Sequence, residues 1–121
     1  MSFASDDLER IARAIEVELE TQAPDGPAHR VVIWIVVDGE DAFIRSYRGP
    51  GARWYREALA NPAVALHVDG RRLTATAIPA TDPDSIERTS AGLRQKYAGD
   101  RGLSGMVSPE NLPTTLRLEP A

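Results

Sequence analysis

Residues 30–41 of this 121-residue chain read RVVIWIVVDGED, and they carry the strongest indication of the fold. Every residue from Val31 to Val37 is apolar and most are β-branched, which is typical of a strand that is buried on both faces. Asp38 and Gly39 open a hairpin turn, after which residues 42–47 form the expected return strand. One face of the first strand must therefore meet the core, while a helix or a second subunit covers the other face.

Towards the N-terminus the hydrophobic period changes from helical to alternating. Residues 5–15 carry apolar residues at helical spacing, and Ser5 is the expected N-cap. Residues 15–20 alternate apolar residues with three glutamates, which predicts a strand with one buried and one exposed face. A helix that continues to Thr21 is the competing interpretation, because glutamate and leucine are good helix formers. We interpret the glutamates as charges that protect an exposed edge strand.

Towards the C-terminus, turn and capping residues mark the remaining elements. A short helix is expected over residues 52–60, followed by a hairpin of residues 63–68 and 71–79. Asp82 is the expected N-cap of a further helix, with Pro83 in its first turn. A loop rich in glycine, serine and proline covers residues 99–113, and residues 114–118 form the last strand. We predict a single domain over residues 1–121, mainly β with short α-helices and built as a small six-stranded barrel.

The overall composition argues against several function classes. The net charge of −4 and the pI of about 5.1 disfavour general nucleic-acid binding. No apolar run approaches the ~20 residues that a membrane-spanning helix needs, and the N-terminal residues do not resemble a secretion signal. We therefore expect neither nucleic acid nor a membrane as a partner. The sequence has no cysteine, which is compatible with the reducing cytoplasm, where we expect the protein.

The strongest functional feature is the stretch FIRSYRGPGARWYR at residues 43–56. It places arginines at the end of a strand, then two glycines, then the start of a helix, a pattern that suits a bound phosphate or carboxylate. We predict that a small, anionic, planar ligand binds here, with Trp54 close to its ring. The residues expected to hold the anion are Arg45, Ser46, Arg48 and Arg53.

The alternative is a basic surface loop that pairs with the glutamates of the chain. Other constellations are weaker, because the only histidines are His29 and His67, and two possible ligands do not make a metal site. The sequence also lacks the nucleophile-elbow motif that a serine hydrolase would show. We therefore predict no metal site and assign no catalytic residue.

These residues also resemble a known protein family. The run from Arg30 through Asp38-Gly39 and residues 43–46 to residues 61–66 resembles the first half of the flavin-binding split barrels that are related to pyridoxamine phosphate oxidase. A closer similarity reaches the C-terminus, through residues 54–56, Lys96-Tyr97, residues 106–109 and residues 114–118. It is to an uncharacterised bacterial family, a domain of unknown function, within the same superfamily.

The resemblance implies a six-stranded split barrel that forms a homodimer, with FMN or a deazaflavin at the dimer interface. It places the cofactor phosphate near Arg30, Arg45, Ser46, Arg53 and Trp54. The lysine that binds the flavin phosphate in the oxidase pattern falls at Ile35 here. Two functions stay open: an oxidoreductase that depends on a flavin or deazaflavin, and a non-catalytic binding or dimeric interaction module that has lost the cofactor.

Overall fold

The computed structural model describes residues 2–121, which form a mainly β protein with short helices. The expected fold class is therefore confirmed. The strands are β1 (Val17–Gln22), β2 (Ala28–Ile33), β3 (Val36–Asp38), β4 (Asp41–Ile44), β5 (Ala63–Val68), β6 (Arg71–Pro79) and β7 (Leu116–Pro120). The α-helices are α1 (Ser5–Arg13), α2 (Arg53–Ala60), α3 (Pro83–Lys96) and α4 (Leu103–Met106), and two 3₁₀ helices are η1 (Gly49–Gly51) and η2 (Pro109–Thr114).

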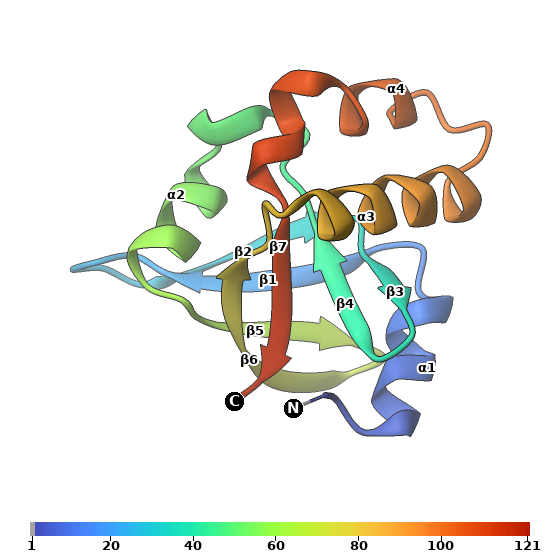
Figure 1. The fold of residues 1–121 in the computed structure, drawn as a ribbon. Helices are drawn as coiled ribbons and strands as arrows, with labels where there is room; N and C mark the ends of the chain where they lie inside the picture. The colour runs from blue at the N-terminus through green and yellow to red at the C-terminus, as the bar shows by residue number, and fades with distance from the viewer. Residues whose placement is uncertain (1) are drawn as a thin grey trace.

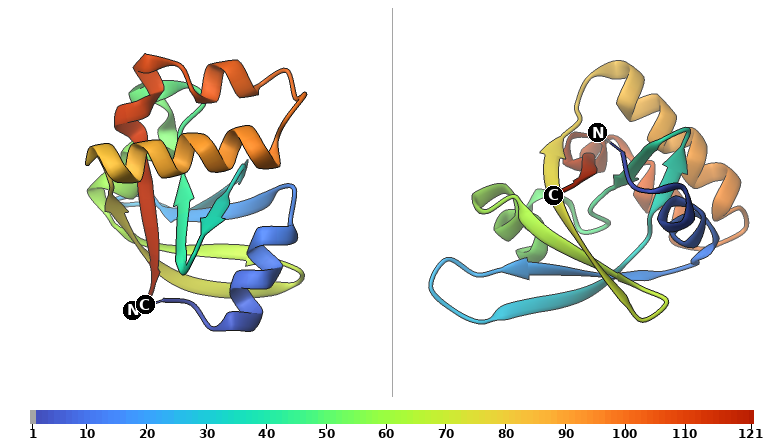
Figure 2. Two further views of the ribbon diagram at one scale, coloured as in Figure 1. Left: turned by 45° about the vertical axis from the view of Figure 1, so that its right-hand side comes forward. Right: turned by 90° about the horizontal axis from the view of Figure 1, so that it is seen from below.

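All strands belong to one antiparallel sheet with the order β2-β1-β5-β6-β7-β4-β3. The sheet curls into a half-barrel, and α3 and α4 lie side by side over one end of it (Figure 1, Figure 2). The last strand of the chain, β7, lies inside the sheet between β6 and β4. The two edges are β2 and β3, which are consecutive along the chain.

The sheet has seven strands because the apolar run that we predicted as one strand is divided. The chain leaves β2 after Ile33 and enters β3 at Val36, so that β2 pairs with β1 whereas β3 pairs with β4. Trp34 and Ile35 form the link between the two edges of the sheet. Neither residue is a turn former, so the sequence contained no local signal for this break.

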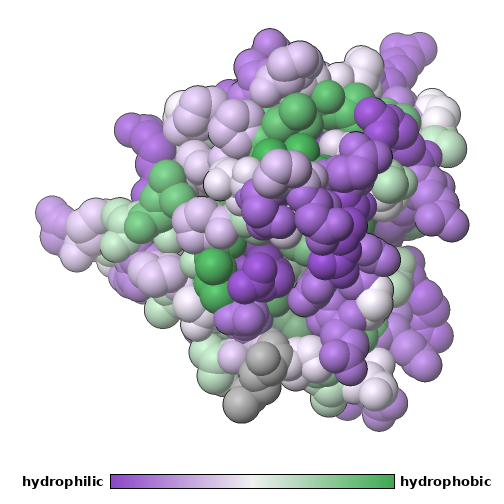
Figure 3. Space-filling model, in the orientation of Figure 1, coloured by the Kyte–Doolittle hydropathy of each residue, from purple (hydrophilic) through white to green (hydrophobic). Residues whose placement is uncertain are grey.

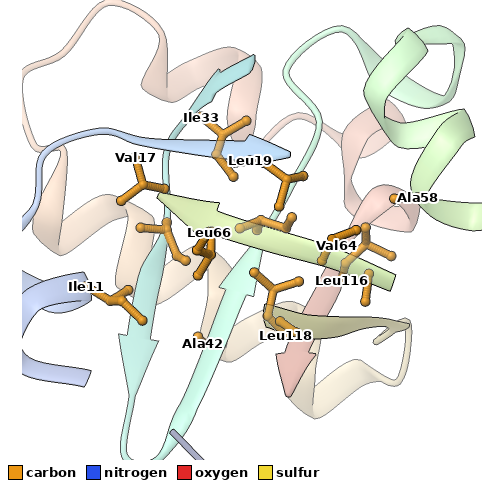
Figure 4. Close-up of a cluster of buried hydrophobic side chains, with 14 of the residues drawn as sticks. Ile11, Val17, Leu19, Ile33, Ala42, Ala58, Val64, Leu66, Leu116 and Leu118 are labelled. Carbon is orange, nitrogen blue, oxygen red and sulfur yellow. The ribbon is translucent and has the colours of Figure 1, made fainter. Parts of the chain in front are cut away.

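The main hydrophobic core fills the concave side of the curled sheet. It contains side chains from the strands, Ile11 of α1 and three residues of α2, and several of these residues are shown in Figure 4. A smaller cluster joins β3 and β4 to α3 and α4 through Val36, Phe43, Leu93 and Met106. Burial of both clusters supplies the main stabilisation of the fold and fixes the ends of β2, β4, α2 and α4 relative to one another.

Two expectations about the N-terminal region are wrong. The N-cap of α1 is Ala4, no side chain caps it, and Ser5 is already helical. Residues 17–22 form a strand rather than a continued helix, but β1 lies between β2 and β5 and is not an edge. Its glutamates are instead paired: Glu18 with Arg30 at 2.7 Å, and Glu20 with Arg72 at 2.8 Å.

The expectations for the C-terminal half are more accurate. The hairpin of β5 and β6 and the helix α3 are confirmed, and the Asp82 carboxylate accepts a hydrogen bond from the Ser85 N–H at 3.0 Å. The predicted loop over residues 99–113 instead contains α4 and most of η2, and the last strand begins at Leu116. The glycines and prolines of residues 99–113 favour a loop, and so the sequence did not indicate these two short helices.

Candidate functional site

A cleft of about 760 Å³ opens between the ends of β2 and β4, helix α2 and helix α4. This volume is in the range of sites that hold a cofactor or a drug-sized molecule. The cleft is lined by Glu16, Val31, Val32, Ile33, Trp34, Arg45, Tyr47, Arg48, Gly51, Ala52, Arg53, Trp54, Arg56, Gly102 and Met106.

The cleft is strongly basic although the protein as a whole is acidic. Four arginines line it and the only carboxylate in its lining is that of Glu16. Arg48, Arg53 and Arg56 are exposed, and within residues 2–121 none of the three forms an ion pair. The predicted alternative, a basic loop paired with glutamates, therefore does not describe these three side chains. Their guanidinium groups are available for an anion.

A tight turn after β4 carries Arg45 and Arg48 and leads to Arg53 at the start of α2. The Ser46 hydroxyl donates a hydrogen bond to the Gly49 carbonyl at 2.7 Å, and the Ser46 N–H donates to the Thr114 hydroxyl at 3.0 Å. Gly49 has a positive φ of 77°, and a side chain there would meet the Asn111 side-chain oxygen at 3.2 Å. The turn thus requires glycine, and it leads directly through η1 into α2, which starts at Arg53 without a side-chain cap.

Arg45 differs from the other arginines because its side chain is buried. Its guanidinium donates hydrogen bonds to the Thr115 hydroxyl at 2.9 Å, the Ser90 hydroxyl at 3.0 Å and the carbonyl oxygens of Met106 and Ile86. Burial lowers the pKa of Arg45 to about 10, and the nearby positive charge of Arg94 acts in the same direction. Arg45 therefore remains charged at neutral pH and places a fixed positive charge at the wall of the cleft.

Three aromatic side chains contribute to the cleft in different ways. Trp54 is only 8% exposed and meets Tyr55 edge-on, with ring centroids 6.0 Å apart. Tyr47 is 57% exposed at the mouth, and it packs so closely on α4 that a side chain at Gly105 would collide with its ring. Trp34 is half-buried and stacks on Tyr97 of the segment after α3.

The structure thus brings together most of the residues that the sequence singled out. Arg45, Arg48, Arg53 and Trp54 line the cleft, and Ser46 shapes the turn beside it. Arg30 lies instead at a second, more polar hollow, where it pairs with Glu18. This second hollow shares Glu16 and Val32 with the main cleft, so the two lie next to each other.

Sequence reasoning missed the residues that reach the cleft from the link after β2 and from α4. The sequence predicts a buried strand at Trp34 and a loop at Gly102 and Met106, whereas in the structure all three residues line the cleft and α4 forms one wall. Gly102 and Gly105 were the available signal, because residues without side chains leave room for the large side chains of Trp34 and Tyr47.

Both histidines bind carboxylates that lie outside the cleft lining. His29 Nδ1 lies 2.9 Å from a Glu57 carboxylate oxygen, and His67 Nε2 lies 2.7 Å from one of Glu20. Within residues 2–121 the structure contains no group of three side chains suited to hold a metal ion, and no helix long and apolar enough to cross a membrane. The face of the molecule in Figure 3 is mostly hydrophilic, with separate hydrophobic patches.

Comparison with known proteins gives one family and one fold. A family model described as "Uncharacterized protein conserved in bacteria (DUF2255)" matches residues 7–118. Among curated proteins, no sequence matches this chain.

Several solved structures share the fold. A putative pyridoxamine 5′-phosphate oxidase from Listeria innocua matches with a TM-score of 0.69 and 16% identity, over 95% of this chain and 90% of that one. An F420 reductase matches with a TM-score of 0.62 and 23% identity, over 93% of this chain and 91% of that one. The heme storage protein HutZ from Vibrio cholerae matches with a TM-score of 0.72 and 16% identity, over 100% of this chain and 92% of that one. At such identities the similarity establishes the fold alone, and it confirms the split-barrel class.

Proposed function

The chain belongs to the bacterial DUF2255 family, and we propose that it binds a planar, anionic cofactor of the flavin or deazaflavin class in the arginine-lined cleft. The observation that carries this proposal is the set of exposed arginines without ion-pair partners in the described chain, beside aromatic and aliphatic walls. Such a site suits a ligand with a charged group at one end and a flat ring at the other.

The names of the structural neighbours support the same ligand chemistry. One neighbour is called an F420 reductase and another a heme storage protein, and both F420 and heme are flat molecules that carry acidic groups. The size of the cleft, about 760 Å³, is sufficient for a ligand of this class. FMN and a deazaflavin both remain candidates, because both combine a tricyclic ring with a phosphate.

We assign the charged end of the ligand to the turn between β4 and α2. Arg48 and Arg53 offer free guanidinium groups, and the start of α2 adds partial positive charge. Arg45 contributes its fixed charge from behind the wall, while Ser46 holds the turn in shape. Trp54 forms part of the wall, and the direct contact of Arg30 with the ligand stays a prediction.

A second copy of the chain is the proposed cover of the cleft. Val32 and Tyr47 lie at the cleft with 54% and 57% of their surface exposed, and the nearby Ile15 precedes β1 with 65% exposed. Large apolar side chains gathered on one face mark an interaction site. A homodimer that buries them would place the cofactor between the subunits, as the family resemblance implies.

The bound cofactor would supply hydride-transfer chemistry, which makes an oxidoreductase the first candidate activity. The residues of this chain would bind and orient the cofactor and exclude water from its ring. A binding or dimeric interaction module without catalysis is the second candidate, and it is favoured by Ile35, which stands where the oxidase pattern has the lysine that binds the flavin phosphate. Reduction of the bound cofactor by an added nicotinamide or deazaflavin donor distinguishes the two. The cytoplasmic location stays a prediction.

Calorimetric titration with FMN and with a deazaflavin tests the proposal. Arg53→Ala removes charge-assisted hydrogen bonds to the anion, each contributing about 1.5–3 kcal/mol, and should weaken binding by about one to two orders of magnitude. Arg71→Ala is the matched control, because Arg71 is exposed, pairs with Asp7 and does not line the cleft. If the unmodified protein binds none of these cofactors, the proposed function is wrong. If Arg53→Ala binds as well as the parent, the assignment of the charged end is wrong.

A further inference from the structure

We infer that Trp34 is the platform on which the flat ring of the ligand stacks, an inference that rests on the proposed function. Trp34 is fixed in place by Tyr97: the ring centroids are 3.9 Å apart and the ring planes are inclined by only 3°. Trp34 is half-buried and lines the cleft. Because Tyr97 occupies one face of the indole, the surface that Trp34 adds to the cleft belongs to its other face and its outer edge.

The support beneath Trp34 is rigid. The Tyr97 hydroxyl donates a hydrogen bond to the Ile15 carbonyl at 2.6 Å and accepts one from the Ile35 N–H at 3.2 Å. The Lys96 amine donates to the Ile35 carbonyl at 2.7 Å. These bonds anchor the stack to the link between β2 and β3 and to the start of β1. The orientation of the indole is thus set before any ligand binds, which lowers the entropic cost of binding.

The residue beside the outer edge of Trp34 is a glycine, so no side chain of that residue covers the indole. The benzene edge of its indole lies against Gly102, where a Cβ atom would be only 3.3 Å away. A larger residue at position 102 would push against the indole and narrow the cleft beside it. The break between the two edge strands, at Trp34 and Ile35, therefore turns the side chain out of the sheet and towards the cleft that Arg48 and Arg53 also line.

Trp54 does not offer an equivalent surface. It belongs to the main core cluster, is only 8% exposed and meets Tyr55 edge-on. The two tryptophans consequently have different roles, with Trp54 as a buried wall and Trp34 as a stacking surface. An electron-rich indole favours an offset stack on an electron-poor flavin or deazaflavin ring.

The chain has only two tryptophans, so fluorescence can report on each one separately. In Trp54→Phe the remaining indole is Trp34, and in Trp34→Phe it is Trp54. We expect FMN or a deazaflavin to quench the fluorescence of Trp54→Phe almost completely and that of Trp34→Phe only in part. Stacking should also add a long-wavelength shoulder to the absorption of the bound cofactor, present in Trp54→Phe and lost in Trp34→Leu.

Calorimetry supplies the affinity. Trp34→Leu should weaken cofactor binding about threefold to tenfold, and Trp34→Phe should restore most of the loss because it keeps an aromatic face on Tyr97. Equal thermal midpoints of Trp34→Phe and the parent show that the fold is intact. If cofactor binds but Trp34→Leu and Trp34→Phe bind like the parent, without a change in the shoulder, the stacking inference is wrong while the proposed function stands. If no protein binds cofactor, both are wrong.

Discussion

The arginines around the cleft fall into two groups that look alike in the sequence. Arg45 is 2% exposed, whereas Arg48, three residues later, is exposed at the rim. The partners of Arg45 come from Ser90 and Thr115, which are 45 and 70 residues away along the chain. No local pattern predicts such partners, so the sequence identified the basic site but not the division between a fixed internal charge and free external ones.

Lys96, the only lysine of the chain, shows the same mixture of charge and burial. Its amine donates to the carbonyl oxygens of Ile11 and Ile35, at 3.3 and 2.7 Å. Burial lowers the pKa of Lys96 from 10.5 to about 8. Below about pH 7 the amine is charged in both the folded and the unfolded chain, so its contribution to stability is constant there.

Between pH 8 and pH 10 we expect Lys96 to increase the stability of the fold. The folded chain loses the proton first, the unfolded chain then binds more protons, and the free energy of unfolding therefore rises with pH. Urea unfolding of the parent and of Lys96→Met at several pH values measures this contribution as a difference between the two. The comparison stays below pH 10, because burial raises the pKa of Tyr97 from 10.0 to about 12. Above pH 10 the unfolded chain loses the Tyr97 proton first, so Tyr97 lowers the free energy of unfolding as the pH rises. Parallel pH profiles would contradict the prediction.

Elements that begin and end with local signals were predicted well. The hairpin of β5 and β6 has Asp69-Gly70 at its turn, and α3 begins with Asp82-Pro83. Elements that are defined by distant contacts were not. The division of residues 30–37 into β2 and β3 depends on two different pairing partners, and α4 depends on packing against Trp34 and Tyr47. The cleft is built mainly from elements of the second kind, which explains why its arginines were found and its α4 wall was not.

Mutation of the two predicted helix caps can show which of them contributes to stability. Asp82 caps α3 through a hydrogen bond to the Ser85 N–H, whereas Ser5 makes no capping bond to α1. Asp82→Ala should lower the free energy of unfolding by about 1 kcal/mol. Ser5→Ala should change it by less than about 0.5 kcal/mol, as expected for an exposed position without a special contact. Urea midpoints at pH 7 measure both, and an equal loss in the two variants would show that the cap assignment of α1 is wrong.

We expect the open side of the cleft to be the surface through which the chain associates with a second copy. Val32, Tyr47 and Ile15 are large, apolar and exposed around it. In a symmetric dimer the same surface of each copy meets its equivalent, so residues near the symmetry axis contact themselves. A charged residue near that axis would be duplicated across the interface and would repel its own copy.

We therefore expect the parent protein to have twice the 13.2 kDa mass of one chain in light scattering at micromolar concentration. Val32→Glu should reduce the mass to that of one chain, because it places two carboxylates at an apolar interface. Leu59→Glu is the control: Leu59 is 48% exposed on α2 but does not line the cleft, and its variant should remain a dimer. A monomeric parent protein would rule out the homodimer.

The position of β7 has a consequence for folding during synthesis on the ribosome. β7 comprises residues 116–120, yet it is hydrogen-bonded to β6 on one side and to β4 on the other. While the chain is being synthesised, β3 and β4 have no strand that joins them to the rest of the sheet, and both β4 and β6 expose an unpaired edge. The split barrel therefore closes only after β7 has been synthesised. A nascent chain that stalls before Leu116 would expose two unpaired strand edges, which can pair with strands of other chains.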